Sequence, residues 1–214
     1  MQKKNQKLAA ILEGQPVIPV LKIGELADAV PLARALVSGG LPAIEITLRT
    51  PDAIDAIRLV ASEVPDAIVG AGTVLSPRHY DEAVDAGAKF IVSPGTTQEL
   101  LDTARDASVP FLPGAITPSE IMALREEGFS ILKFFPAEQS GGAAFLKSLA
   151  SPLAGMRFCP TGGISLKNAK DYLSLSNVVC VGGSWVAPDE LIAGGEWEKI
   201  RVLSREAAGL KQAG

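Results

Sequence analysis

The stretch AIEITLRTPDAIDAI at residues 43–57 contains one complete strand-and-helix unit. Its first part alternates apolar, β-branched residues and predicts a strand. Thr50 and Pro51 then provide a hydroxyl cap and a proline, which together are typical of a helix start. Ile54 and Ile57 follow at the spacing of one helical face. The stretch therefore predicts a β-strand followed directly by an α-helix.

The same pattern recurs along the whole chain. The starts of the apolar runs are separated by roughly 20 to 27 residues, which suits a strand plus a helix. The eight runs are PVIPVL from Pro16, AIEIT from Ala43, AIVGAGT from Ala67, KFIVS from Lys89, VPFLP from Val109, SILKFF from Ser130, RFCPT from Arg157 and VVCVGG from Val178. No linker or low-complexity segment divides them. We therefore expect an α/β protein in which residues 1–214 form a single (β/α)8 TIM barrel with a short extra N-terminal helix. A doubly wound sheet is the alternative.

Further helix starts repeat this local chemistry. Ser76-Pro77 and Thr117-Pro118 again place a hydroxyl before a proline. Two pairs also have the spacing of a capping box, Thr96 with Glu99 and Thr117 with Glu120.

Composition excludes several classes of protein. The 214 residues are 47% hydrophobic and 21% charged, so the chain is not disordered. Twenty basic and 24 acidic residues give a net charge of −4, without the basic excess of a nucleic-acid-binding protein. No apolar run reaches the length of about 18 residues that a membrane helix needs. Cys159 and Cys180 lie in apolar runs, which predicts buried, reduced thiols and a cytoplasmic location.

Lys133 is the most informative charged residue because apolar residues flank it inside a predicted strand, Ile131 to Phe135. Strand alternation puts Lys133 on the same face as Ile131 and Phe135. If that face lines the barrel, burial lowers the pKa of the lysine and supplies the neutral amine that Schiff-base chemistry requires. The alternative is a lysine that extends to solvent or pairs structurally with a carboxylate.

The predicted strand at residues 43–49 carries Glu45, Thr47 and Arg49 on one face. With the apolar face against the helices, a carboxylate, a hydroxyl and a guanidinium would face the barrel interior. Glu45 suits proton transfer, and the planar fork of Arg49 suits a substrate carboxylate. An internal salt bridge is the alternative.

A pair of adjacent glycines (a diglycine) ends each of the last two predicted strands. The first pair lies in Thr161-Gly162-Gly163 and the second in Gly182-Gly183-Ser184. These are the loops in which barrels most often bind phosphate through backbone N–H groups. We therefore predict a phosphate site at Gly162, Gly163, Gly183 and Ser184.

The Gly70-Ala71-Gly72-Thr73 segment lacks the lysine of a nucleotide-binding loop, so we expect close backbone packing there, with the Thr73 hydroxyl at the mouth of the barrel. A single histidine without clustered acids or cysteines indicates no catalytic metal.

Six segments together resemble the 2-keto-3-deoxy-6-phosphogluconate aldolases, the KDPG/KHG aldolase family. They are IEITLRT from Ile44, GAGTV from Gly70, SPG from Ser93, KFFPAE from Lys133, FCPTGGI from Phe158 and GGSW from Gly182. The resemblance extends from the N-terminal helix to near Lys211.

This resemblance implies a (β/α)8 class I aldolase that needs no metal or cofactor and is usually trimeric. It would cleave 2-keto-3-deoxy-6-phosphogluconate to pyruvate and glyceraldehyde 3-phosphate, as in Entner–Doudoroff catabolism. Lys133 would form the Schiff base and Glu45 would be the acid and base. The pyruvate carboxylate would lie at Arg49 and Thr73, with Thr161 and Phe135 lining the same pocket.

Three alternatives stay open at this stage. The same imine could serve cleavage of 4-hydroxy-2-ketoglutarate or decarboxylation of oxaloacetate. The substrate could belong to the galactonate series. A sugar-phosphate-binding protein without turnover, in which Lys133 is only a charge partner of Glu45, is the alternative outside enzymes.

Overall fold

The computed structural model describes residues 1–210, and residues 211–214 at the end of the predicted domain lie outside this range. The strands are β1 (Val17–Leu21), β2 (Ala43–Thr47), β3 (Ile68–Gly72), β4 (Ile91–Val92), β5 (Phe111–Leu112), β6 (Ile131–Phe134), β7 (Arg157–Pro160) and β8 (Val181–Gly183). The helices are α1 (Gln2–Leu12), the short 3-10 helix η1 (Leu26–Asp28), α2 (Ala29–Ser38), α3 (Ala53–Glu63), α4 (Pro77–Asp85), α5 (Gln98–Asp106), α6 (Pro118–Glu126), α7 (Gly142–Leu149), α8 (Ala169–Leu173), α9 (Asp189–Ala193) and α10 (Trp197–Ala208). Each strand begins within three residues of the start of one of the eight predicted apolar runs.

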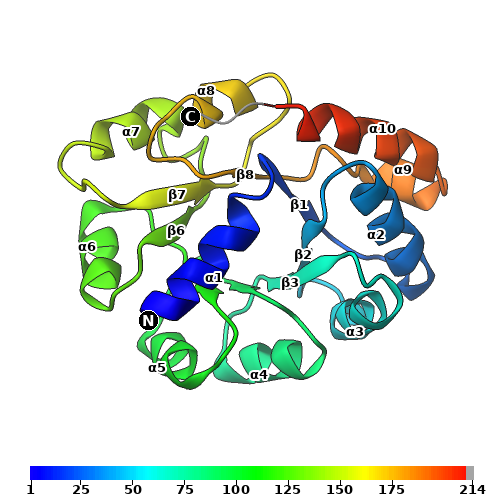
Figure 1. Ribbon diagram of the computed structural model, residues 1–214, viewed down its shortest axis with the longest axis horizontal. Helices are drawn as coiled ribbons and strands as arrows, with labels where there is room; N and C mark the ends of the chain where they lie inside the picture. The colour runs from blue at the N-terminus through cyan, green and yellow to red at the C-terminus, as the bar shows by residue number, and fades with distance from the viewer. Residues whose placement is uncertain (211–214) are drawn as a thin grey trace.

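The strands are parallel and form a curled sheet. Six of them pair in the order β5-β4-β3-β2-β1-β8, and β6 pairs with β7. Isolated parallel bridges connect Gly114 with Lys133 and Thr161 with Gly182. Figure 1 shows the helices around the outside of these strands. The predicted α/β class and its eight strand-and-helix units are confirmed.

Strand alternation divides the apolar residues into two clusters. The larger cluster contains Ile44, Ile46, Leu132 and Phe134 together with apolar residues of the surrounding helices. The smaller cluster takes the opposite faces of the same strands, among them Ala43 and Ile131, together with Phe90, Leu112, and Leu8 and Leu12 of α1. Ala43 and Ile131 are the first residues of their strands, so α1 covers the N-terminal ends of the strands (Figure 1). The helix α1 therefore leaves the C-terminal ends of the strands uncovered, and the candidate site lies there.

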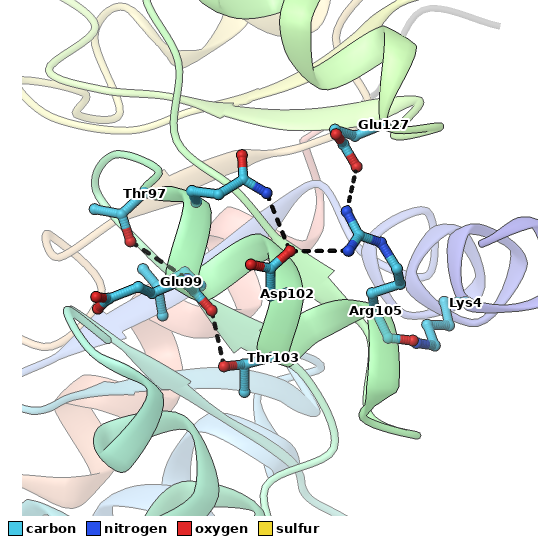
Figure 2. Close-up of polar contacts among 9 residues, drawn as sticks. Lys4, Thr97, Glu99, Asp102, Thr103, Arg105 and Glu127 are labelled. Carbon is cyan, nitrogen blue, oxygen red and sulfur yellow. Dashed lines mark hydrogen bonds and ion pairs between the residues drawn. The ribbon is translucent and has the colours of Figure 1, made fainter.

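A lysine anchors α1 to the neighbouring helix α5. Lys4 Nζ donates hydrogen bonds of 2.7 Å to the carbonyl oxygens of Ala104 and Arg105, in the last turn of α5. A positive charge at this end of a helix is favourable because the last carbonyl groups carry partial negative charge. Arg105 itself donates to Asp102 at 2.8 Å and to Glu127 at 2.9 Å (Figure 2).

Two of the predicted helix caps are confirmed. Ser76 caps α4 by accepting from the N–H of His79, with Pro77 at the first helical position. Thr117 and Glu120 form a complete capping box at the start of α6. Both depend only on residues within one turn, which is why the sequence predicts them.

Two other predicted caps are wrong. The chain makes a turn after Thr50, so α3 begins at Ala53 with Asp52 at its N-cap, and the Thr50 hydroxyl has no hydrogen-bond partner in the described part of the chain. At α5 the cap is Thr97, which accepts from the N–H of Leu100 (Figure 2). Thr96 instead donates to the carbonyl of Gly114 at 3.0 Å.

Cys159 and Cys180 are buried free thiols, as predicted. Burial and the neighbouring Cys159 thiol raise the pKa of Cys180, which keeps it protonated. Within residues 1–210, no helix has both the length and the apolar character needed to cross a membrane.

Candidate active site

A buried ion pair lies at the centre of the site. Lys133 Nζ of β6 is 3.1 Å from Glu45 Oε1 of β2, and their side chains are only 6% and 4% exposed. The two residues are 88 positions apart in the sequence. Parallel strands bring them together because each projects its polar side chain from the face opposite the helix-packed residues. Isolated burial of either charge would be costly, so each residue depends on the other.

Gly72 at the end of β3 leaves the space that Glu45 occupies. A Cβ at Gly72 would lie 2.0 Å from Glu45 Oε1 and 2.6 Å from its Cδ. Gly70, two residues earlier, packs in the same way against the Phe90 ring, where a Cβ would come within 2.4 Å. The close packing predicted for this glycine segment is confirmed, and the structure identifies its partners.

A chain of hydrogen bonds orients Arg49. Arg49 Nε donates to Thr47 Oγ1 at 2.9 Å, and the Thr47 hydroxyl donates to the carbonyl oxygen of Leu21 at 2.7 Å. Thr47 is buried at the end of β2, so this chain fixes the guanidinium relative to the neighbouring strand β1. The remaining guanidinium donors stay available for an anion.

A pocket of about 150 Å³ lies at the C-terminal ends of the strands. Its lining includes Arg49, Phe135 and Thr161 together with both diglycines and Ser184. Lys133 Nζ is 5.5 Å from the centroid of the Phe135 ring, so the ion pair lies next to the pocket. Val20 and Ile164 also line the pocket, and no role for them, or for Gly182 of the second diglycine, was predicted from the sequence.

The two diglycines contribute backbone to this pocket in different ways. Gly162 and Gly163 have φ values of +101° and +73°, a conformation that side chains rarely tolerate. Among the described residues, no group accepts a hydrogen bond from the backbone N–H groups of Gly162, Gly163 and Ser184. Gly183 has a packing role as well, because a Cβ there would lie 1.7 Å from the Trp185 ring.

The two threonines expected at the site differ. Thr161 is buried in the pocket, and within the described chain its hydroxyl lacks a hydrogen-bond partner. Thr73 follows Gly72 with a φ of +56°, which is costly for a β-branched residue and typical of functional sites. Thr73 does not line this pocket, and in the chain it directly follows Gly72, the residue that packs against Glu45.

The roles of Gly72 and Thr47 were not predicted from the sequence. Gly72 was part of a segment expected to pack closely, but its partner Glu45 belongs to another strand. Thr47 was predicted on the interior face without a function. Within residues 1–210, no group of three or more histidine, cysteine or acidic side chains gathers as a metal site.

The fold and this site together define a parallel α/β enzyme with a buried lysine at its centre. The chain belongs to the KDPG and KHG aldolase family, whose model matches residues 8–203. The family predicted from the sequence motifs is confirmed.

Relatives of known name match nearly the whole chain. The chain is 52% identical over 206 residues to the 2-dehydro-3-deoxy-phosphogluconate aldolase of Dickeya dadantii, covering 95% of this chain and 97% of the relative. It is 50% identical to the KHG/KDPG aldolase of Escherichia coli, with the same coverage.

A crystal structure of KDPG aldolase from Legionella pneumophila, with pyruvate captured as a covalent carbinolamine intermediate, is also similar. It has a TM-score of 0.92 and 45% identity, and the match covers 94% of this chain and 98% of that one. The aldolase of Zymomonas mobilis with 3-phosphoglycerate has a TM-score of 0.90 and 46% identity, over 95% and 96% of the two chains.

Proposed function

We propose that this protein is a class I aldolase that cleaves 2-keto-3-deoxy-6-phosphogluconate to pyruvate and glyceraldehyde 3-phosphate. The observation that carries the proposal is the buried contact of 3.1 Å between Lys133 and Glu45, next to a pocket that offers an arginine and free backbone donors. The family and its relatives of the same name support the substrate.

The first step is formation of the imine. The Lys133 ammonium must lose a proton before it can attack, and the Glu45 carboxylate at 3.1 Å is close enough to accept it. The neutral amine then adds to the C2 ketone and gives a carbinolamine. Glu45 returns its proton to the carbinolamine hydroxyl, which leaves as water, and a protonated imine remains. The pyruvate captured as a carbinolamine in the Legionella pneumophila relative supports this course.

Cleavage uses the imine as an electron sink. Glu45 removes the proton of the C4 hydroxyl, the C3–C4 bond breaks, and its electron pair moves into the enamine. Glyceraldehyde 3-phosphate leaves. The protonated Glu45 then gives its proton to C3 of the enamine, and hydrolysis of the resulting imine by water releases pyruvate and regenerates the free Lys133 amine.

The pocket residues bind the two charged ends of the substrate. Arg49, held by Thr47, takes the carboxylate next to the ketone, with the unpartnered hydroxyl of Thr161 as a further donor and the Phe135 ring as an apolar wall. Thr73 contributes its hydroxyl from the Glu45 side.

At the other end, the free N–H groups of Gly162, Gly163 and Ser184 bind the phosphate, with Gly183 allowing close approach. The 3-phosphoglycerate in the Zymomonas mobilis relative supports a phosphorylated ligand.

A second activity, cleavage of 4-hydroxy-2-ketoglutarate, is favoured by the relative named KHG/KDPG aldolase at 50% identity. The same imine would serve both substrates. A comparison of kcat/KM for the phosphorylated and the non-phosphorylated substrate decides which of them the enzyme prefers.

Reductive trapping tests the mechanism directly. Borohydride added in the presence of pyruvate should attach a three-carbon unit to Lys133, as mass spectrometry of the digested protein would show. Lys133→Met should abolish both the adduct and turnover, whereas Lys89→Met, at an exposed lysine, should retain both. A wild-type protein without an adduct at Lys133 would reject the mechanism.

We further propose that the eight strands close into a (β/α)8 barrel that extends over residues 1–214 as one domain. The Gly114–Lys133 and Thr161–Gly182 bridges support this because they link β5 to β6 and β7 to β8, the two junctions between the six-stranded sheet and the β6-β7 pair. A single cooperative unfolding transition is expected.

The quaternary structure that we propose is a homotrimer, on the basis of family membership, with a cytoplasmic location supported by the two free thiols. Light scattering should give three times the chain mass of 22.3 kDa.

A further inference from the structure

Glu138 belongs to the KFFPAE motif, yet the proposed reaction gives it no role. It lies directly against the Gly162–Gly163 turn. Its backbone N–H donates to the carbonyl of Gly162 at 3.1 Å. A Cβ at Gly163 would lie 2.7 Å from both Cβ and Cγ of Glu138. The turn therefore rests on the stem of this side chain.

The Glu138 carboxylate is held by a buried tyrosine. Tyr172 of α8 is only 1% exposed, and its hydroxyl donates a hydrogen bond to Glu138 Oε1. Burial, and then the bond to this carboxylate, raise the pKa of Tyr172, so the phenol keeps the proton that it donates. Glu138 is otherwise exposed, and a glutamate side chain without such a partner would move freely.

The same helix also binds the turn directly. Asn168, at the N-cap of α8, donates through Nδ2 to the carbonyl of Gly163 at 3.1 Å. Its Oδ1 accepts from the N–H of Ser165 at 2.8 Å. The turn thus contacts both Glu138, which Tyr172 of α8 holds, and Asn168 at the N-cap of α8.

Such support matters because a diglycine turn is intrinsically flexible. Glycine adopts many backbone conformations, so ordering the turn when a ligand binds would cost affinity. A turn that already lines the pocket, is held in one conformation and keeps its N–H groups unpaired within the described chain avoids this cost. The benefit applies only to a ligand that uses those N–H groups.

We propose that Glu138 and Tyr172 are positioning residues that hold the Gly162–Gly163 turn ready for the substrate phosphate, and thereby set the preference for phosphorylated over non-phosphorylated substrates. This inference rests on the proposed function. It separates two parts of the site, because the Lys133–Glu45 pair carries out the bond-making and bond-breaking steps, and the side-chain hydrogen-bond partner of each within residues 1–210 is the other rather than a residue of α8.

Tyr172→Phe, which removes one hydroxyl group, tests the inference in the aldol-addition direction with pyruvate. The KM for glyceraldehyde 3-phosphate should rise up to about tenfold, because the released side chain and turn must then be ordered when the ligand binds. The kcat/KM for glyceraldehyde without phosphate should stay unchanged. Exchange of the pyruvate methyl protons with deuterium oxide, followed by NMR, should also stay at the wild-type rate.

Matched variants separate positioning from general destabilisation. Tyr80→Phe removes the hydroxyl of another fully buried tyrosine, whose partner is the Val109 carbonyl at 2.8 Å. This variant should leave the ratio of kcat/KM for glyceraldehyde 3-phosphate to kcat/KM for glyceraldehyde unchanged. Glu138→Ala, at an exposed position, should reproduce the effect of Tyr172→Phe, and the double variant should add little to either. Glu138→Gln, which keeps an acceptor for Tyr172, should not raise the KM.

Two results would overturn the inference. One is an unchanged KM for glyceraldehyde 3-phosphate in both Tyr172→Phe and Glu138→Ala. The other is an equal loss of kcat/KM for glyceraldehyde 3-phosphate and for glyceraldehyde, since a structural defect would impair the reaction of both aldehydes. Failure of the proposed function would look different, because the wild-type protein itself would then neither exchange pyruvate protons nor form a borohydride adduct at Lys133.

Discussion

Gly72 packs so closely against the Glu45 carboxylate that a Cβ added to Gly72 would lie 2.0 Å from Glu45 Oε1. The two residues come from adjacent strands, and the missing side chain of one makes room for the functional group of the other. The position of the carboxylate beside Lys133 therefore depends on a residue that carries no chemistry of its own.

Gly72→Ala should lower kcat at least about tenfold, because even a small misplacement of a catalytic group is costly. The methyl group must displace the Glu45 carboxylate from Lys133, so the rate of pyruvate proton exchange should fall with kcat. Gly24→Ala is the matched control, since a Cβ at Gly24 meets nothing within 4 Å. A Gly72→Ala enzyme with wild-type kcat would disprove this dependence.

Glu45→Gln should lower kcat by roughly 100-fold or more if the carboxylate moves protons in the reaction. The amide has nearly the same shape but accepts protons poorly, so the fold should persist while cleavage slows. Steady-state kinetics coupled to pyruvate release measures the effect, with Glu63→Gln at an exposed position as the control. An unchanged kcat would reduce Glu45 to a structural partner of Lys133.

Thr47→Val should raise the KM for substrate about tenfold and change kcat much less. Valine has the shape of threonine but cannot link Arg49 to the Leu21 carbonyl, so the guanidinium loses its fixed orientation. Thr47→Ser keeps the hydroxyl and should restore most of the affinity. Equal KM values for the valine and serine variants would contradict the role of this hydrogen-bond chain.

The capping box of α6 should make a pH-dependent contribution to stability. Hydrogen bonds from the backbone N–H groups of Thr117 and Ile116 lower the pKa of Glu120 in the folded protein. The stabilisation is therefore complete above the ordinary glutamate pKa and is lost as the pH falls through the lowered folded-state pKa.

Urea unfolding of Glu120→Ala should give a free energy of unfolding about 0.5–1 kcal/mol below wild type at pH 7, the lower part of the range for caps because the site is largely exposed. The difference should shrink toward pH 3. Glu126→Ala on the same helix is the control. A deficit that is the same at both pH values would argue against the carboxylate as its source.

The sequence by itself determined the strand-and-helix order and the family, and it named the individual residues that we propose for the site. Strand runs, helix faces, and the caps at Ser76 and Thr117 depend on neighbours within one turn or a few residues, so local patterns predict them. The two faces of a strand follow in the same way, which is why Glu45 was expected on the interior face, whereas a solvent-facing Lys133 stayed open as an alternative.

Only the tertiary structure decided which of these residues contact each other. Strand register sets the position of each side chain relative to those on the neighbouring strands, and it depends on pairing between distant segments. It brought Lys133 to Glu45, Gly72 to the same carboxylate, and Tyr172 to Glu138. It also moved the cap of α5 from Thr96 to Thr97, since a contact with Gly114 on the next loop outweighed local spacing. A local pattern specifies a side chain and its face, whereas the partner of that side chain is set by the packing of the whole chain.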